Sequence, residues 1–133
     1  MTPQGSDRVR VVVVDDSPES RAAIGEAVDE TNGLELVASV GSGEEALAVL
    51  PRLDPKLVLL DIRMPGVNGL ETSRRIRASG ARAVVVLVSA LRTSELPDGA
   101  KSCGAAAILY KGEVSLRRLS TLWRSVEPKH AAA

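Results

Sequence analysis

The stretch VRVVVVDD, residues 9–16, decides the fold class of this 133-residue chain. Its first six residues form an apolar run of strand length, interrupted only by Arg10, and two carboxylates follow that run directly. A strand that is apolar on both faces is typical of a parallel sheet covered by helices on both sides. Three later runs share this design and also end in polar residues: 57–60 before Asp61, 83–88 before Ser89, and 105–109 before Tyr110-Lys111.

Helical patterns lie between the apolar runs. Ser17-Pro18 is typical of a helix start, Ser42-x-x-Glu45 forms a capping box, and Ser115 precedes a last amphipathic helix. A further strand is predicted over 34–40. A fourth helix is expected over 93–103, although Pro97-Asp98-Gly99 makes it a poor one. Five β-α units therefore predict an α/β, doubly wound parallel sheet.

Composition excludes several classes of protein. Seventeen basic residues balance seventeen acidic ones, which argues against binding nucleic acid through overall charge. Apolar residues make up 44% of the chain, but no apolar run approaches the ~20 residues that span a bilayer. Cys103 is the only cysteine, so no intramolecular disulfide can form. With no secretory signal visible at the N-terminus, a cytoplasmic location is expected.

The chain is expected to hold one domain. Residues 8–126 form that domain in our interpretation, residues 1–7 are an N-terminal tail, and residues 127–133 are a disordered tail.

Polar side chains at the predicted strand ends point to chemistry. The carboxyl ends of parallel strands meet at one edge, where such sheets bind ligands, so these side chains should converge there: Asp15, Asp16, Asp61, Ser89 and Lys111. Three close carboxylates repel one another and need positive charge to stay ionised. An all-oxygen set suits Mg²⁺, and a carboxylate beside it can attack phosphorus. Ser89 and Lys111 could then contact phosphoryl oxygens.

This ordered set resembles the response-regulator receiver domain of two-component phosphorelay signalling. The residues that carry the resemblance are Asp15-Asp16, Asp61 with Met64-Pro65 and Gly69, Ser89-Ala90, and Lys111 behind Gly104-Ala105. The resemblance implies a flavodoxin-like sandwich with strand order 2-1-3-4-5. It also implies phosphorylation of Asp61 by a histidine kinase or phosphotransfer protein.

The resemblance also assigns the site residues. Asp16 and Asp61 would bind Mg²⁺ directly, Asp15 through water, and Arg63 through its backbone carbonyl. Ser89 would rotate to bond the phosphoryl group, and Lys111 would pair with it.

The same resemblance implies a signalling switch rather than a dedicated enzyme. Its only reactions would be Mg²⁺-dependent self-phosphorylation and slow self-dephosphorylation. The readout would lie on the face of the fourth helix, fifth strand and fifth helix. The expected partners are the phosphodonor and an output protein or an output domain outside this chain. Neither nucleic acid nor membrane is expected to bind this domain, and the chain should be a monomer or weak dimer.

Three places depart from the family pattern, and one is the stretch Pro97-Asp98-Gly99, which weakens the fourth helix of the usual signalling face. Gly112 stands where the family usually has a proline after the lysine. Ile108 stands where the family usually has an aromatic residue that swings inward on activation, and whether Tyr110 replaces it is open.

Two alternatives to the phosphorylated switch stay open. The first is a phosphorylation-independent, receiver-like interaction module, which the departures at Ile108 and Gly112 favour. The second is an Asp-nucleophile phosphohydrolase of the haloacid-dehalogenase type. That class has a second Asp two residues after the nucleophile, where this chain has Arg63.

Overall fold

The computed structural model describes residues 8–91 and 95–127, whose strands form one parallel five-stranded sheet of order β2-β1-β3-β4-β5. The predicted strand order is therefore confirmed. The strands are β1 (Val9–Val14), β2 (Leu34–Val40), β3 (Leu57–Asp61), β4 (Val84–Ser89) and β5 (Ala107–Tyr110).

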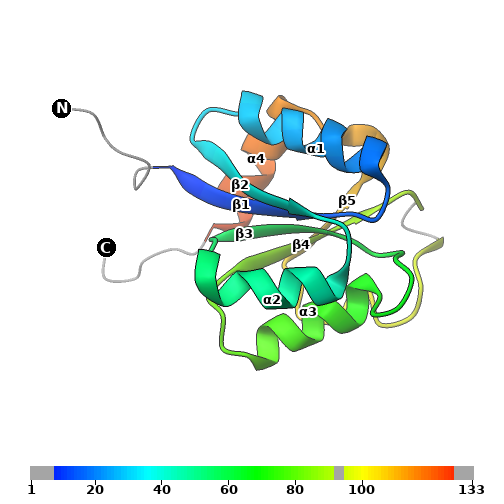
Figure 1. The fold of residues 1–133 in the computed structure, drawn as a ribbon. Helices are drawn as coiled ribbons and strands as arrows, with labels where there is room; N and C mark the ends of the chain where they lie inside the picture. Colours follow the sequence, from blue (N-terminus) through cyan, green and yellow to red (C-terminus); the bar gives the residue numbers. More distant parts are fainter. Residues whose placement is uncertain (1–7, 92–94, 128–133) are drawn as a thin grey trace.

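Helices cover both faces of the sheet (Figure 1). On one face lie α1 (Pro18–Glu30) and α4 (Leu116–Val126), and on the other lie α2 (Gly43–Leu53) and α3 (Gly69–Ala78). A short 3-10 helix, η3 (Lys111–Glu113), follows β5. None of the described helices has the length and apolar character that a bilayer crossing requires.

The apolar strands supply two cores from alternate residues. Val12 and Val14 of β1 face the α2 and α3 side, whereas Val11 and Val13 face the α1 and α4 side. All four side chains are buried, because successive strand residues point to opposite faces of the sheet. This explains why the run 9–14 lacks the polar alternation of a strand with one wet face.

Local capping signals start the helices where the sequence predicts. The side chains of Ser17, Ser42 and Ser115 accept hydrogen bonds from backbone N–H groups in the first turns of α1, α2 and α4. Each bond satisfies a donor that the helix itself leaves unpaired. Helix α2 contains Pro51 and ends at Leu53, after which Asp54 adopts a left-handed conformation.

The expected helix over 93–103 is wrong for the residues that the structure describes. Residues 92–94 lie outside the described chain, and residues 95–103 form turns and one residue of 3-10 geometry. Pro97 lacks a backbone donor and Gly99 has a φ of 91°, so neither favours an α-helix. The helix α4 is thus the one expected as the fifth.

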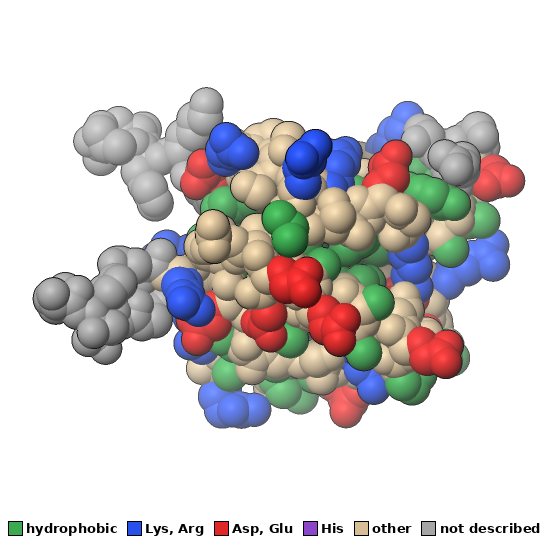
Figure 2. Space-filling view, turned by 90° about the horizontal axis from the view of Figure 1, so that it is seen from above, with side chains coloured by type: hydrophobic (Ala, Val, Ile, Leu, Met, Phe, Trp, Pro, Cys, Tyr) green, Lys and Arg blue, Asp and Glu red, His purple; other side chains and the backbone are tan. Residues whose placement is uncertain are grey.

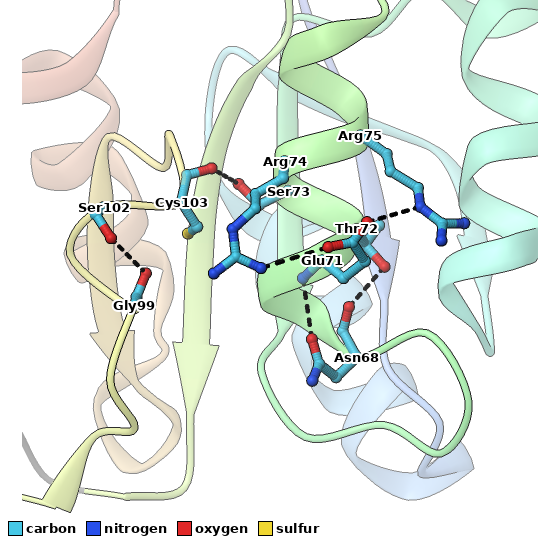
Figure 3. Close-up of polar contacts among 9 residues, drawn as sticks. All are labelled: Asn68, Glu71, Thr72, Ser73, Arg74, Arg75, Gly99, Ser102 and Cys103. Atoms are coloured by element: carbon cyan, nitrogen blue, oxygen red, sulfur yellow. Dashed lines mark hydrogen bonds and ion pairs between the residues drawn. The ribbon is translucent and has the colours of Figure 1, made fainter.

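The connection between β4 and β5 is instead fastened to α3 (Figure 3). The buried Ser73 hydroxyl donates a hydrogen bond of 3.0 Å to the backbone carbonyl of Cys103. A Cβ atom at Gly99 would lie 2.9 Å from a guanidinium nitrogen of Arg74, so the backbone passes close to α3 there. Side chains of α3 therefore hold a segment that has no helical ladder of its own.

Candidate functional site

Carboxylates from two neighbouring strands meet at the carboxyl edge of the sheet. Val14 pairs with Leu60 in the register of β1 and β3, which sets Asp15 beside Asp61. Ligand oxygens of Asp15, Asp16 and Asp61 all lie within 4.8 Å of one another. Asp15 and Asp61 are buried, whereas Asp16 is exposed. The parallel register thus forms the acidic crevice that the sequence predicts.

Asp15 is held rigidly at the bottom of the crevice. Its Oδ1 accepts a hydrogen bond of 2.9 Å from the Ser17 backbone N–H, and its backbone N–H donates to Val40. Arg21 donates a hydrogen bond of 2.8 Å to the backbone carbonyl of Asp15. The carboxylate therefore has a fixed direction, and its exposed fraction is 0%.

Lys111 supplies the positive charge. Its Nζ lies 2.9 Å from Asp15 Oδ2 and 3.5 Å from Asp61 Oδ2. Burial alone would lower the pKa of Lys111, but the two carboxylates more than offset that effect and raise it. Lys111 therefore remains an ammonium ion and bridges the two acids.

The surroundings of Asp61 disfavour its ionised form. Burial first, and the charge of Asp15 second, raise the pKa of Asp61 to about 6, although Lys111 and the Arg63 backbone N–H act in the opposite direction. One lysine therefore does not fully compensate two buried carboxylates. A second cation would reduce the repulsion between the two carboxylates.

The donor set fits a divalent cation such as Mg²⁺. Asp15 Oδ2 is buried and has an ion-pair contact with Lys111, yet it accepts no hydrogen bond among the described residues. Asp16 presents a carboxylate at the mouth of the same cluster. Carboxylates with space for several waters are what Mg²⁺ prefers, so the residues present fit this ion.

Ser89 lies on the next strand, one residue beyond the register partner of Asp61. Its exposed fraction is 2%, and its hydroxyl accepts a hydrogen bond of 2.9 Å from the Leu91 backbone N–H. The side chain is therefore poised between the crevice edge and the start of the β4–β5 connection.

The loop after Asp61 requires a glycine at its end. Gly69 donates a hydrogen bond of 2.9 Å to the Ile62 carbonyl. A Cβ atom at Gly69 would overlap the backbone carbonyl oxygen of Asp61, closer than any side chain can approach. Close packing of α3 on the end of β3 thus shapes this loop, and the sequence shows the glycine but not that contact.

An open cavity of about 760 Å³ continues from the crevice. Asp16 and Arg63 line it at the acidic end, and Leu91 and Pro97 line it where it reaches the β4–β5 connection. The cavity gives a reacting group access to the exposed side of the crevice.

Tyr110 and Gly112 form a contact that sequence reasoning missed. Tyr110 pairs with Ser89 in the register of β4 and β5, and its ring lies so close to Gly112 that a Cβ atom there would be 2.5 Å from it. Ile108 is half-buried in the core on the α2 and α3 side. The departure at Gly112 therefore accommodates the Tyr110 ring, because the small residue at 112 leaves room for it.

Known proteins resemble this chain over most of its length. The family model described as the response regulator receiver domain matches residues 11–122. The response regulator GacA of Pseudomonas protegens is 38% identical over 104 residues, which cover 78% of this chain and 49% of that protein. The chain thus spans about half the length of that relative.

Solved structures agree with this match. The signal receiver domain of the putative response regulator NarL from Mycobacterium tuberculosis has a TM-score of 0.81 and 28% identity, with 90% of this chain and 95% of that chain covered. The receiver domain of the histidine kinase CKI1 from Arabidopsis thaliana, solved with Mg²⁺, has a TM-score of 0.76 and 28% identity, with 90% and 92% covered.

Proposed function

The chain belongs to the response regulator receiver domain family, and from this premise we propose that Asp61 is its phosphoryl acceptor. The observation that carries the proposal is the acidic cluster, in which Asp61 ends the central strand β3 beside Asp15 and Lys111. Lys111 lies 3.5 Å from Asp61 Oδ2, so a cation already stands beside the carboxylate that would carry the phosphoryl group.

In the proposed reaction, one carboxylate oxygen of Asp61 attacks the phosphorus of a phosphohistidine. A new P–O bond forms, the bond from phosphorus to the donor nitrogen breaks, and that nitrogen leaves with the electron pair and takes up a proton. Lys111 lies 3.5 Å from Asp61 Oδ2 and would stay paired with the phosphoryl oxygens. Water returns the phosphoryl group as inorganic phosphate.

Mg²⁺ would neutralise charge as the phosphoryl group approaches the Asp61 carboxylate. The ion would be held by Asp16 and Asp61 directly, by Asp15 through water, and by the Arg63 carbonyl. Asp15 orients this set through its hydrogen bond from Ser17. The relative solved with Mg²⁺ supports the choice of ion.

The readout would begin at Ser89. The Ser89 hydroxyl now accepts a hydrogen bond from the Leu91 N–H, and a turn of the side chain towards the phosphoryl group, to which it would donate, would weaken that bond. That change loosens the start of the β4–β5 connection. We therefore propose the connection, β5 and α4 as the signalling face, with a histidine kinase or phosphotransfer protein as donor and an output protein or domain as reader.

The rival functions are less well supported. A phosphohydrolase of the haloacid-dehalogenase type would use an acid two residues after Asp61, and Arg63 cannot serve because it keeps its proton. A phosphorylation-independent module would not need the buried pair Asp15 and Lys111, which costs desolvation to keep.

Acetyl phosphate with Mg²⁺ tests the proposal. We expect the intact mass to rise by one phosphoryl group in the wild type and not in Asp61→Asn, which preserves side-chain shape. Asp98→Asn, an exposed acid in the β4–β5 connection, is the matched control and should still be modified. A wild type that stays unmodified, or a modified Asp61→Asn, would contradict the assignment.

A further inference from the structure

The surface where α3 meets the β4–β5 connection carries basic side chains that the proposed reaction does not use. Arg74 and Arg77 are exposed one helical turn apart on α3, and Lys101 is exposed in the connection. We call these three residues the basic cluster. The surface of α1 and α4, on the opposite side of the sheet, differs because it carries acidic and basic side chains together (Figure 2).

A tight turn in the connection brings Lys101 close to Arg74. The Ser102 backbone N–H donates a hydrogen bond of 3.1 Å to the carbonyl of Gly99, which places Lys101 within that turn. The guanidinium of Arg74 reaches the first residue of the same turn, Gly99, and lies between α3 and the connection in Figure 3. Two of the three cations therefore lie at one turn.

Arg77 lies against the connection just beyond this turn. Its Cγ is 2.6 Å from the position that a Cβ atom at Gly104 would take, so its aliphatic stem rests on the connection backbone. The negative end of the α3 dipole favours a cation in the last helical turn, which contains Arg77. That effect does not require the side chain to cross to the connection. The glycine at 104 thus makes room for an arginine that remains exposed.

The charges of the basic cluster are only partly balanced. Glu71 is the one acidic residue of α3, and it contacts Arg75 at 2.9 Å and Arg74 at 3.4 Å. Among the described residues, neither Arg77 nor Lys101 has an ion pair. Carboxylates from another molecule can therefore pair with both of them without displacing an existing partner.

An open cavity of about 270 Å³ adjoins the basic cluster. Leu96, Pro97 and Ala100 supply apolar side chains to its lining, and Asp98 and Lys101 line it as well. The cavity gives an aliphatic side chain a place beside the cations.

This combination favours an acidic protein segment over nucleic acid. A nucleic acid presents a phosphate at every nucleotide, so some phosphates would face Asp98 or Glu71. A polypeptide can instead place an apolar residue beside Asp98 and its carboxylates on the cations. Arginine also matches a carboxylate through two parallel hydrogen bonds.

We propose that the basic cluster and its cavity bind an acidic segment of a partner protein, the reader that the proposed function requires. Carboxylates of the segment pair with Arg74, Arg77 and Lys101, and one aliphatic side chain enters the cavity. The signalling face thereby extends from the connection to α3. The inference rests on the proposed function only for the role of the partner, because the basic cluster lies outside the acidic crevice and needs no phosphoryl group.

NMR titration of the unphosphorylated full chain tests the chemistry of the partner. The probe is a short synthetic peptide with a leucine between two runs of glutamates. At low salt we expect a dissociation constant of roughly 0.1–1 mM, with amide shifts at residues 74–77 and 96–104. The same peptide with glutamines should not bind. No binding of the glutamate peptide at about 5 mM, or equal binding of the two peptides, would overturn the proposal.

Two further ligands test the cavity and the rival partner. A peptide with serine in place of the leucine should bind at least about threefold more weakly, and equal binding would contradict the role of the cavity. An oligothymidylate of the same charge should bind at least about tenfold more weakly than the glutamate peptide. Tighter binding of the oligothymidylate at the same residues would make this a nucleic-acid surface and overturn the proposal.

Substitutions identify the surface. Arg77→Met with Lys101→Met removes two charges but keeps the aliphatic stems, so it should weaken peptide binding about tenfold and leave the thermal midpoint unchanged. The matched control, Arg117→Met with Arg124→Met, removes two exposed charges from α4 and should bind the peptide as the wild type does. Equal weakening by the two variants would mean that only net charge matters. A lower midpoint with unchanged binding would mean that the basic cluster only fastens the connection. Either result overturns the proposal.

Acetyl phosphate separates this proposal from the proposed function. Arg77→Met with Lys101→Met should still gain one phosphoryl group, since neither residue belongs to the acidic crevice. A wild type that is phosphorylated but does not bind the peptide would overturn this proposal alone. A wild type that binds the peptide but is not phosphorylated would overturn the proposed function alone.

Discussion

The acidic crevice and the β4–β5 connection lie next to each other, but different forces order them. In the crevice, Asp15 and Asp61 are placed by the backbone register of β1 and β3, and Lys111 binds both. In the connection, the described residues 95–106 have no helical ladder and are held largely by single contacts such as that of Ser73 with Cys103. The comparison teaches that the acidic crevice lies on a rigid edge of the sheet, beside a segment that few hydrogen bonds hold in place.

The largest expected effect comes from filling the close contact beneath the crevice. Gly69→Ala should lower the free energy of unfolding by about 3–4 kcal/mol, because its Cβ would collide with the Asp61 carbonyl. Urea unfolding measures the loss. Gly25→Ala is the control, since its Cβ would approach only the flexible end of Leu36 at 3.1 Å. Equal losses at the two sites would show that the crevice tolerates movement.

Removing the positive charge of Lys111 from the crevice should cause the next largest loss of stability. Lys111→Met in the presence of a chelator should cost about 2–3 kcal/mol, because two buried carboxylates then lack their counter-charge. The loss is less than for a fully buried pair, since the Lys111 side chain is 23% exposed.

Adding Asp15→Asn to this variant should restore part of the stability, which a cycle of urea midpoints would reveal. The exposed Lys101→Met serves as control. If Lys111→Met and Lys101→Met lower the free energy of unfolding equally, the ion pairs of Lys111 contribute nothing to stability. The crevice would then be no more rigid than the connection.

Neutralising Asp61 should change stability in the opposite direction. The folded-state pKa of about 6 lies above the ordinary value of 3.8, so the folded chain binds the proton more tightly than the unfolded chain. Stability from this group is therefore fully present below about pH 4 and is lost as the pH rises through about 6. In chelator at pH 8, Asp61→Asn should be more stable than wild type by about 1–2 kcal/mol, with little difference at pH 4.

Thermal unfolding across this pH range measures the difference. A destabilised Asp61→Asn at pH 8 would mean that the three charges of the crevice are already balanced without a metal ion.

The smallest effect is expected in the connection. Ser73→Ala should cost about 1 kcal/mol, because the Cys103 carbonyl loses its donor. Hydrogen exchange should become faster across residues 95–106 and stay unchanged in β1 and β3. Ser125→Ala, which removes a hydroxyl bonded within its own helix, is the control. Exchange that also becomes faster in the strands would show that the two regions are one cooperative unit.

The crevice was predictable from the sequence because features close together in the chain determine where its residues lie. Apolar runs identified the strands, and the residue after each run fell at the carboxyl edge, so Asp15, Asp61 and Lys111 could be brought together without coordinates. Caps were equally local, as the hydrogen bond from Glu45 to Ser42 shows.

The connection was not predictable because its order depends on contacts distant in sequence. Helical spacing over 93–103 was outweighed by Pro97 and Gly99, and the bond from Ser73 to Cys103 joins residues 30 apart. Likewise, the strand expected over 105–109 forms over Ala107–Tyr110, where pairing with β4 decides its bounds. The contact of the Tyr110 ring with Gly112 results from side-chain packing, which the hydrophobic pattern of the sequence does not predict.

The central claim is that the rigid edge carries the chemistry on one defined carboxylate. Its most direct test is to phosphorylate the chain with acetyl phosphate and Mg²⁺, reduce the acyl phosphate with hydride, and locate the reduced residue by peptide mass spectrometry. We predict a single reduced site at Asp61, with Asp15 and Asp16 unmodified. Reduction at either of those residues, at an acid of the β4–β5 connection, or at none would contradict the account.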